Sequence, residues 1–283
     1  MLEVGIPDNS LSNCADLREK TVRAGMLARA LAVFRADSIF VYKTPHSPRS
    51  NSGDSDLLLL LLKYLDTPQY LRKRVFHMTP ALKYAGLLPP LRTQSHPLLD
   101  DALSEGSLRW GIQTEPGRVD IGIRETVRYH EAISESEPTL FRVVTGPPNM
   151  ALERVDRSRA EAYFGYEVLT ENDLIDRLKK HTSVRVVFSR SGTPYRKVVD
   201  VMRNSVLKTR GVTAVFGSPT QGVSELFSDR LGALKQVVDF WVNTVENQGT
   251  ETVRLEEALP ISLGLLNSDF GDVVSRPGFY AET

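Results

Sequence analysis

Strand and helix patterns alternate over residues 1–42, and this alternation restricts the fold more than any other feature of the chain. Residues 2–7 form a short apolar run that ends at a proline, and residues 38–42 form a second apolar run. Between them, apolar side chains recur at helical spacing from Val22 to Phe34, behind a capping box of Asp16 and Glu19. A strand, a helix and a strand in this order are the unit of a parallel sheet, so an α/β fold is predicted.

The pattern changes between about Leu91 and Tyr166. Short β-like runs at 108–113, 118–123 and 139–144 are separated by turn sequences, which favours a small barrel. Alternation then returns, with helices predicted at 172–180, 194–210 and 256–267 and strands at 184–188, 212–216 and 239–242. We therefore expect an α/β domain made of residues 1–90 and 167–283, interrupted by a barrel at 91–166.

Bulk properties favour a cytoplasmic protein. The chain of 283 residues suits two domains, and its single cysteine, Cys14, permits no internal disulfide. The N-terminus shows no signal-peptide pattern. The longest aliphatic run, 57–62, is far shorter than the roughly 20 residues that span a bilayer, so no membrane partner is expected.

Basic residues are concentrated in two segments, although the formal net charge is zero. Residues 177–210 carry many Lys and Arg side chains but a single acid, Asp200, and residues 63–92 are similarly basic around Asp66. Clustered cations of this kind hold polyanions, whereas the alternative is a solvated helix face.

A glycine-containing loop directly follows the predicted strand at 212–216. Gly217 and Gly222 stand at the carboxyl end of this strand, where α/β proteins bind ligands. Their spacing is that of a P-loop, but Val223 occupies the position where a P-loop requires Lys. The loop is therefore interpreted as a ligand site that does not take a nucleoside triphosphate, or as a plain turn from strand to helix.

A long polar loop follows the predicted strand at 239–242 and leads into the apolar last helix. It runs from Asn243-Thr244-Val245 through Gln248-Gly249-Thr250-Glu251-Thr252 to Arg254 and Glu256-Glu257-Ala258. Long polar loops with hydrogen-bonding side chains are often functional. The alternative is that Thr252 or Arg254 only caps the last helix.

Together the two loops resemble the cofactor site of the SPOUT superfamily, methyltransferases whose C-terminal chain forms a trefoil knot. The resemblance is strongest to an archaeal and eukaryotic family of RNA methyltransferases with a barrel inserted in the knotted domain. That family's opening is similar to Ile6-Pro7-Asp8-Asn9-Ser10, Asp16-Leu17-Arg18 and Ala28-Arg29-Ala30, and its closing signature is similar to the 243–258 loop. The resemblance implies an α/β SPOUT trefoil-knot domain with an inserted small OB-like β-barrel.

The resemblance also implies an S-adenosylmethionine-dependent RNA methyltransferase that works as a homodimer. Related members make N3-methyluridine in ribosomal RNA, which is the preferred product here. Alternatives are a transfer-RNA substrate, a ribose 2′-hydroxyl acceptor, and a non-catalytic RNA-binding role. The apolar helix at 57–62 offers surface for a dimer contact, or is buried under the barrel.

The family binds its cofactor among the knot loops, mostly through backbone groups. The residues expected to bind it here are Phe216, Gly217, Ser218, Pro219, Gly222, Asn243, Thr244, Val245, Gln248, Gly249, Thr250, Thr252, Val253 and Ala258. With RNA as the polyanion, the residues expected to hold its backbone are Lys179, Lys180, Arg190, Arg196 and Lys197.

An N3 acceptor loses its proton, and a nearby cation stabilises the developing anion. Arg18 lies where other SPOUT branches place a functional arginine, and Arg254 falls in the knot motif, so both are candidate catalytic cations. Glu256 is the candidate proton acceptor, with Glu251 as its rival, and each of these residues could instead be a cap or a structural ion pair. No metal is expected, because methylsulfonium chemistry requires none and the histidines lack metal-ligand spacing: His46, His77, His96, His130 and His181.

Overall fold

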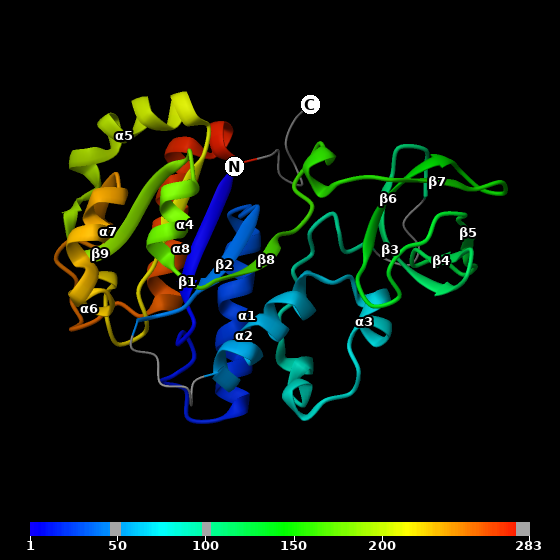
Figure 1. Ribbon diagram of the computed structural model, residues 1–283, viewed down its shortest axis with the longest axis horizontal. Helices are drawn as coiled ribbons and strands as arrows, with labels where there is room; N and C mark the ends of the chain where they lie inside the picture. The colour runs from blue at the N-terminus through cyan, green and yellow to red at the C-terminus, as the bar shows by residue number, and fades with distance from the viewer. Residues whose placement is uncertain (46–51, 98–102, 276–283) are drawn as a thin grey trace.

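The computed structural model describes residues 1–45, 52–97 and 103–275, which form two lobes built on two separate β-sheets (Figure 1). The parallel lobe contains β1, β2, β8, β9, β10 and β11 with the helices that cover them. The inserted lobe contains β3 to β7, which come between β2 and β8 in the chain. His46, one of the histidines considered above, lies outside the described residues.

The parallel lobe contains a six-stranded sheet in the order β11-β9-β10-β1-β2-β8, and every neighbouring pair is parallel. The predicted α/β fold with a parallel sheet is therefore confirmed. The first strand of the chain lies inside the sheet, between β10 and β2. The strands are β1 (Leu2–Pro7), β2 (Ser38–Tyr42), β8 (Glu167–Glu171), β9 (Val184–Pro194), β10 (Val212–Val215) and β11 (Phe240–Asn243).

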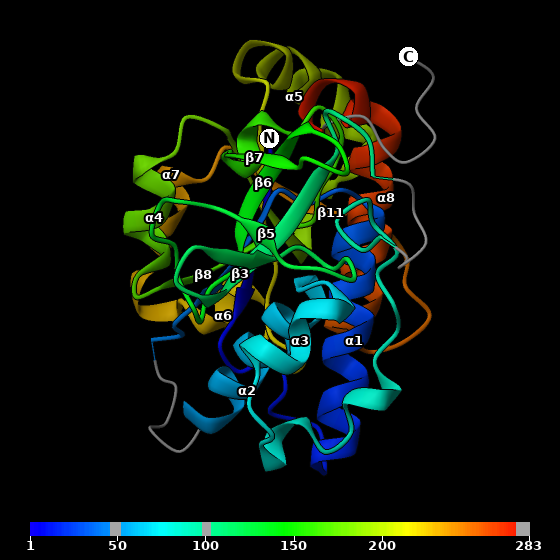
Figure 2. The ribbon, with the colours of Figure 1, turned by 90° about the vertical axis from the view of Figure 1, so that its right-hand side faces the viewer.

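Helices cover both faces of this sheet, because successive side chains of each strand point to opposite sides (Figures 1 and 2). One face packs against α1 (Leu17–Val33), α2 (Ser52–Asp66), α5 (Tyr195–Thr209) and α8 (Leu255–Val274). The other face packs against α4 (Leu174–Lys180), α6 (Val223–Leu226) and α7 (Leu231–Val237). Within β2, Ile39 and Val41 belong to the first core, and Phe40 and Tyr42 to the second.

The leucine run at 57–62 lies on α2, and it is an internal element of the parallel lobe. Leu57, Leu58, Leu61 and Leu62 are all buried in the core that α2 shares with α1. Most of the run therefore offers no surface for a dimer contact, because the chain's own core covers it.

The inserted lobe is a curled antiparallel sheet in the order β5-β4-β3-β6-β7 (Figure 2). Within the described residues it is open at β5 and β7, so the curl makes half of a barrel, which confirms in part the small barrel that was predicted. Strand β5 has only two residues, which is too short to continue the curl. The strands are β3 (Leu108–Glu115), β4 (Arg118–Asp120), β5 (Val127–Arg128), β6 (Thr139–Thr145) and β7 (Ala151–Arg154).

Helix α3 (Gln69–Val75) fastens the inserted lobe to the parallel lobe. The Tyr70 hydroxyl donates to the Trp110 carbonyl at 2.7 Å, and Arg74 pairs with Asp120 at 2.9 Å. The Tyr70 ring packs so close to Gly122 that a β-carbon there would lie 2.6 Å from it, and Gly122 has a φ of +82°. Glycine is therefore required at this contact for both space and backbone conformation.

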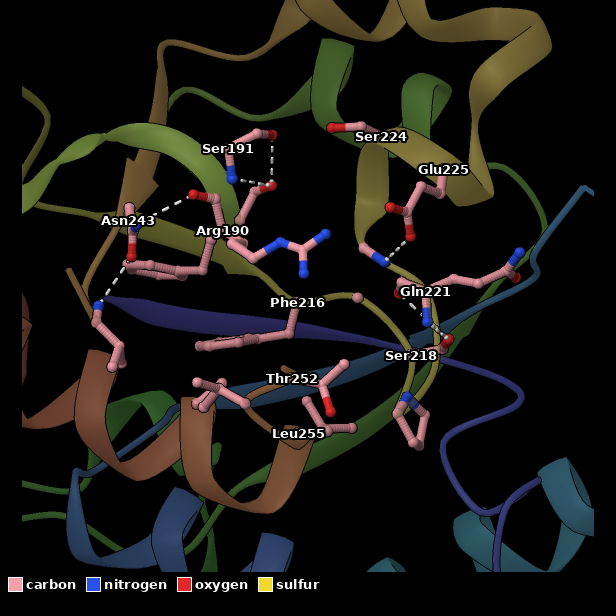
Figure 3. A pocket seen from close by; sticks show the side chains of 18 of the residues that line it. Arg190, Ser191, Phe216, Ser218, Gln221, Ser224, Glu225, Asn243, Thr252 and Leu255 are labelled. Atoms are coloured by element: carbon pink, nitrogen blue, oxygen red, sulfur yellow. Dashed lines mark hydrogen bonds between the residues drawn. The ribbon is translucent and has the colours of Figure 1, made fainter. Parts of the chain in front are cut away.

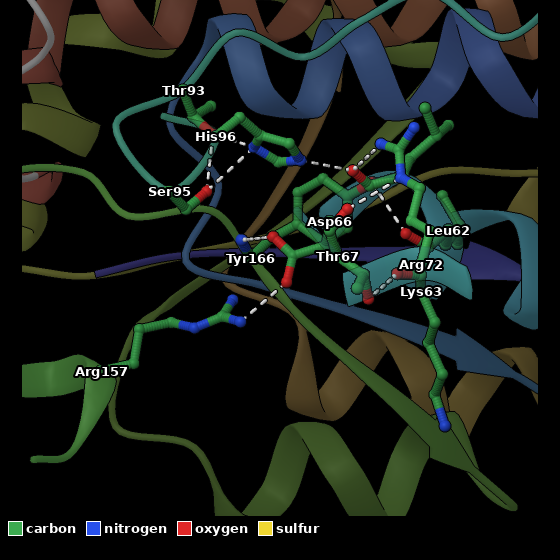
Figure 4. A network of polar contacts seen from close by, with 11 residues as sticks. Leu62, Lys63, Asp66, Thr67, Arg72, Thr93, Ser95, His96, Arg157 and Tyr166 are labelled. Carbon is green, nitrogen blue, oxygen red and sulfur yellow. Dashed lines mark hydrogen bonds and ion pairs between the residues drawn. The ribbon is translucent and has the colours of Figure 1, made fainter. Parts of the chain in front are cut away.

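A polar cluster at the end of α2 also joins the lobes; we call Asp66, His96, Arg157 and Tyr166 the joint cluster (Figure 4). Asp66 accepts from the Tyr166 backbone N–H at 2.9 Å and from Arg157 Nη2 at 2.7 Å. The His96 Nε2–H donates to the Leu65 carbonyl at 2.9 Å, which satisfies a group that a helix end leaves without a partner. Burial lowers the pKa of His96 below its ordinary value.

Short 3₁₀ turns at Pro80–Leu82, Ala85–Leu87, Arg157–Arg159 and Ser228–Arg230 complete the described structure. Among the described residues, no helix combines the length and the apolar character that crossing a membrane requires.

Candidate functional site

The two loops singled out in the sequence meet at the carboxyl ends of β10 and β11, where they enclose a pocket of about 320 Å³ (Figure 3). Parallel sheets place their ligand sites at this edge. The lining residues are Phe188 to Ser191 from β9, Phe216 to Gly222 with Ser224 and Glu225, Asn243 to Val245, Gln248, Glu251 to Val253, Leu255, Ala258 and Ser262. Every one of them belongs to the parallel lobe.

The first loop is a tight turn closed by Ser218. The Ser218 backbone N–H donates to the Gln221 carbonyl at 2.8 Å, and the Gln221 N–H donates back to Ser218 Oγ at 2.9 Å. A β-carbon on Gly217 would lie 2.7 Å from the Gln221 oxygen and 2.9 Å from the Gly222 α-carbon. Only glycine fits at 217, because backbone atoms cannot move aside as the tip of a side chain can.

The second loop is held by its own polar side chains. Asn243 donates from Nδ2 to the Arg190 carbonyl at 3.0 Å and accepts from the Val245 N–H at 2.9 Å. Gln248 donates to the carbonyls of Thr250 and Glu251 at 2.8 and 2.9 Å. These bonds shape the loop before any ligand binds, which lowers the entropy that binding would cost.

Apolar side chains form the base of the pocket. The rings of Phe188 and Phe216 stack with their centroids 4.9 Å apart and their planes 20° from parallel. Both phenylalanines are buried, and Leu255 and Ala258 of α8 line the same pocket. The pocket thus combines an apolar base with hydroxyl, amide and backbone groups above it, which is the usual make-up of a small-molecule site.

Most residues expected to bind a cofactor line this pocket. The exceptions are Gly249 and Thr250, which belong to the second loop without lining it. The sequence did not point to Phe188, Ser189, Ser191, Ser224, Glu225 or Ser262. The β9 residues come to the pocket because β9 lies between β10 and β11 in the sheet, and only the strand order reveals this.

The three predicted catalytic residues do not line the pocket. Arg254 is the N-cap of α8, where its backbone N–H donates to Glu257 Oε2 at 2.8 Å. Arg18 lies exposed in the first turn of α1. Glu256 points toward α1 and pairs with Arg23 at 3.4 Å, with both side chains buried. The rival acid, Glu251, does line the pocket. The catalytic roles stay a prediction.

The five predicted RNA-binding residues are spread over three elements. Lys179 and Lys180 lie on α4, whereas Arg196 and Lys197 lie on α5, and these helices cover opposite faces of the sheet. Arg196 pairs with Glu246 of the second loop at 3.0 Å. Arg190 lines the pocket itself. The basic segment therefore does not form one continuous surface, although each of its members stays a candidate for RNA contact.

Candidate metal ligands do not gather anywhere in the described residues, where no group of three or more His, Cys, Asp or Glu side chains has a suitable arrangement. His77, His130 and His181 lie apart, and His181 faces Glu3, with its Nδ1 3.0 Å from the carboxylate.

The fold and the pocket define an α/β protein with a ligand site at the carboxyl edge of a parallel sheet. Comparison with known proteins identifies its family: the family model described as "Putative RNA methyltransferase" matches residues 1–266, and the chain belongs to this family.

Relatives of the chain are found in archaea and in animals. An uncharacterized protein of Halobacterium salinarum is 34% identical over 281 residues, which cover 92% of this chain and 96% of that protein. The 28S rRNA (uridine-N(3))-methyltransferases of human and mouse are 29% and 28% identical. Those alignments cover 94% and 98% of this chain, and 77% and 78% of the relatives.

Proposed function

We propose that the chain transfers a methyl group from S-adenosylmethionine to N3 of a uridine in ribosomal RNA. Its family and its animal relatives, which are 28S rRNA (uridine-N(3))-methyltransferases, support this reaction. The observation that carries the proposal is the pocket at the ends of β10 and β11, where the two loops come together and only glycine fits at 217.

The pocket fits the chemical parts of S-adenosylmethionine. A purine would pack on the apolar base that includes Phe216 and Leu255, and the Ser218 and Thr252 side chains line the same space as possible partners for ribose and amino-acid groups. When bound, the cofactor supplies an electrophilic methyl group on its sulfonium. The chain's residues then have to orient the acceptor, exclude water and handle the proton that N3 loses.

The carboxylates that could accept this proton differ in their distance from the pocket and in their partners. Glu251 and Glu225 line the pocket, and the Glu225 carboxylate already accepts the Gly222 N–H at 2.8 Å. Glu256 is engaged by Arg23, so its position supports a structural role joining α8 to α1. Among the predicted catalytic residues, Arg254 retains the strongest support because its neighbours Val253 and Leu255 both line the pocket.

We also propose the SPOUT trefoil knot, with residues 1–90 and 167–283 as the knotted domain and 91–166 as the insertion. The support is that Asn243, at the end of β11, donates to the Arg190 carbonyl of β9, and the loop that follows leads into α8 on the face that carries α1 and α5.

The proposed homodimer finds support on a different surface from the one first considered. Val22 and Met26 of α1 are 41% and 49% exposed, and Ile261 of α8 is 42% exposed, while the two helices pack against each other. A second copy packed on α1 and α8 would cover exposed apolar side chains of both helices. A Met26→Asp change should then shift the protein to monomers in sedimentation velocity.

The decisive experiment is methylation followed by nucleoside mass spectrometry. Ribosomal RNA from cells lacking the gene is incubated with the protein and S-adenosylmethionine, and the digest is compared with authentic N3-methyluridine. A methylated ribose or another methylated base would reject the proposed acceptor atom. Incorporation into transfer RNA alone would reject the proposed RNA.

A further inference from the structure

Hydrogen bonds at its backbone carbonyl and at its guanidinium hold Arg190 at the mouth of the pocket. Its backbone carbonyl accepts from Asn243 Nδ2 at 3.0 Å, and its Nη1 donates to the Glu251 carbonyl at 3.0 Å. Figure 3 shows the guanidinium extending from β9 into the space between Phe216 and the Ser224–Glu225 turn. The strand and the second loop thus hold a cation over the pocket.

Within the described residues, no ion pair neutralises the charge of Arg190. It is the one Lys or Arg side chain among the described residues that line the pocket. Arg185, five positions earlier on β9, forms a two-pronged ion pair with Asp239 at 2.8 and 2.9 Å. Arg190 has no carboxylate partner among the described residues, and its guanidinium donates a single hydrogen bond. A guanidinium carries five N–H donors in all, so this single bond leaves donors for a ligand.

The proposed reaction creates negative charge where such a donor is useful. N3 of uracil lies between two carbonyl groups, so the charge left when its proton departs is shared with O2 and O4. In the transfer, N3 forms a bond to the methyl carbon, the carbon–sulfur bond breaks and its electron pair stays on sulfur, and the N3 proton passes to water or a carboxylate. A planar guanidinium can donate to the carbonyl oxygens that carry the shared charge.

We propose that Arg190 is a catalytic residue that contacts a carbonyl oxygen of the acceptor uracil and stabilises the anion formed at N3. This inference rests on the proposed function. It gives Arg190 a different role from the RNA-backbone contact expected from the sequence, because a residue that lines the pocket is placed to meet the reacting base.

The first test compares Arg190→Ala and Arg190→Lys with Arg203→Ala. Arg203 is an exposed arginine of α5 that pairs with Asp269 and does not line the pocket, so it serves as the matched control. We expect the single-turnover rate, with RNA and cofactor both saturating, to fall about 100-fold in Arg190→Ala. Arg190→Lys should recover part of the rate, because Lys keeps the charge and loses the planar fork. Arg203→Ala should keep the wild-type rate.

The second test changes the acidity of the acceptor. N3 of 5-fluorouridine loses its proton more readily than N3 of uridine, and raising the pH favours the anion in both. If Arg190 stabilises that anion, the rate deficit of Arg190→Ala should shrink with 5-fluorouridine RNA and should shrink as the pH rises. A structural role predicts the same deficit for both RNAs at every pH, and that result would overturn the proposal.

Calorimetry with S-adenosylmethionine tests the remaining possibility, that Arg190 is a cofactor contact. Arg190→Ala should bind the cofactor within about twofold of wild type. A tenfold loss of cofactor affinity with a normal saturated rate would make Arg190 a cofactor contact and would overturn its catalytic role. A wild-type product other than N3-methyluridine would overturn the proposed function and this inference together. N3-methyluridine made at an unchanged rate by Arg190→Ala would overturn this inference alone.

Discussion

The parallel lobe and the inserted lobe differ in how their sheets are buried. All six residues of β1 are buried, and helices cover both faces of its sheet. In the inserted lobe, β7 has three exposed residues of four, and two small clusters form the core. The pocket is lined by the parallel lobe alone. The comparison teaches that the lobe whose sheet is covered on both faces holds the candidate site, while the open sheet is suited to presenting a surface to a large substrate.

Gly217→Val provides the strongest test of where the chemistry resides. The added side chain would collide with the backbone at Gln221 and Gly222, so the turn would have to open. We expect no detectable binding of S-adenosylmethionine by calorimetry. Gly232→Val is the control, because a β-carbon there meets no atom within 4 Å. Unchanged affinity in Gly217→Val would remove the first loop from the cofactor site.

Asp66→Ala tests whether the two lobes behave as one unit. The change leaves Arg157 and the Tyr166 N–H without their shared acceptor. We expect a loss of about 3 kcal/mol in the free energy of unfolding, at the low end for a broken buried pair, since Asp66 and Arg157 keep 12% and 22% of their side chains exposed.

The control for Asp66→Ala is Glu153→Ala, which breaks an exposed pair with Arg142 inside the inserted lobe. Its cost should stay within about 1 kcal/mol in urea titrations. Equal costs for the two variants would mean that the joint cluster stabilises the protein no more than a surface ion pair does.

Replacing residues 103–155 by a short Gly-Ser linker tests what the inserted lobe contributes to cofactor binding and to RNA binding. Because none of these residues lines the pocket, affinity for S-adenosylmethionine should stay within about twofold. RNA affinity should fall about tenfold if the open sheet presents a binding surface, since about 1.4 kcal/mol of contact corresponds to that factor. An unchanged RNA affinity would confine RNA recognition to the parallel lobe.

Double replacement of Lys179 and Lys180 by Ala asks which face of the parallel lobe holds the RNA backbone. Lost phosphate contacts weaken affinity without affecting sequence preference, and they should reduce the salt slope of binding by about 1.5. The rate at saturating RNA should not change. Replacing Arg196 and Lys197 probes the opposite face in the same way. If only the α5 pair alters the slope, the RNA lies on the α5 face.

The smallest expected effect is a pH dependence at the joint cluster. Burial lowers the pKa of His96, so the unfolded chain takes up its proton at a higher pH than the folded protein does. The stability that comes from neutral His96 is present above about pH 6.5 and is lost as the pH falls below that value, by at most about 1.4 kcal/mol per pH unit. Urea titrations from pH 7.5 to 5.5 should show this slope, and His96→Gln should flatten it.

The sequence predicts the local parts of this structure better than the contacts between distant parts. The predicted N-cap at Asp16 is present, with the Glu19 N–H donating to Asp16 at 2.8 Å, because a cap depends on neighbours in the chain. The Glu19 carboxylate accepts from the Ala15 N–H at 2.8 Å, one residue before the N–H that a capping box uses. Strand β9 is longer than predicted. In its added part, Gly192 lies against the backbone of Val242, and a β-carbon on Gly192 would lie 2.5 Å from the Val242 carbonyl carbon. No local sequence pattern predicts this contact between β9 and β11.

The residues of the candidate site also differ in how well the sequence predicts them. Glycine and polar side chains mark the two loops in the sequence, and both loops line the pocket. Phe188 looks like any other core residue of a strand, and its place in the pocket depends on the order of strands in the sheet. The ion pair between Arg23 of α1 and Glu256 was not predicted from the sequence, because the direction in which a helix faces is set by what packs on it.

The position of β1 has a consequence for how the chain acquires its structure. This strand is made before the inserted lobe, yet it lies inside the sheet and pairs with β10, whose residues 212–215 emerge only after the whole inserted lobe has been synthesised. During that interval one edge of β1 has no partner, and apolar side chains such as Val4 and Ile6 lack part of their core. Long-range pairing of this kind slows folding and exposes strand edges to association. Production of the protein should therefore benefit from slower translation or from chaperones that bind the unpaired edge of β1 until β10 has been synthesised.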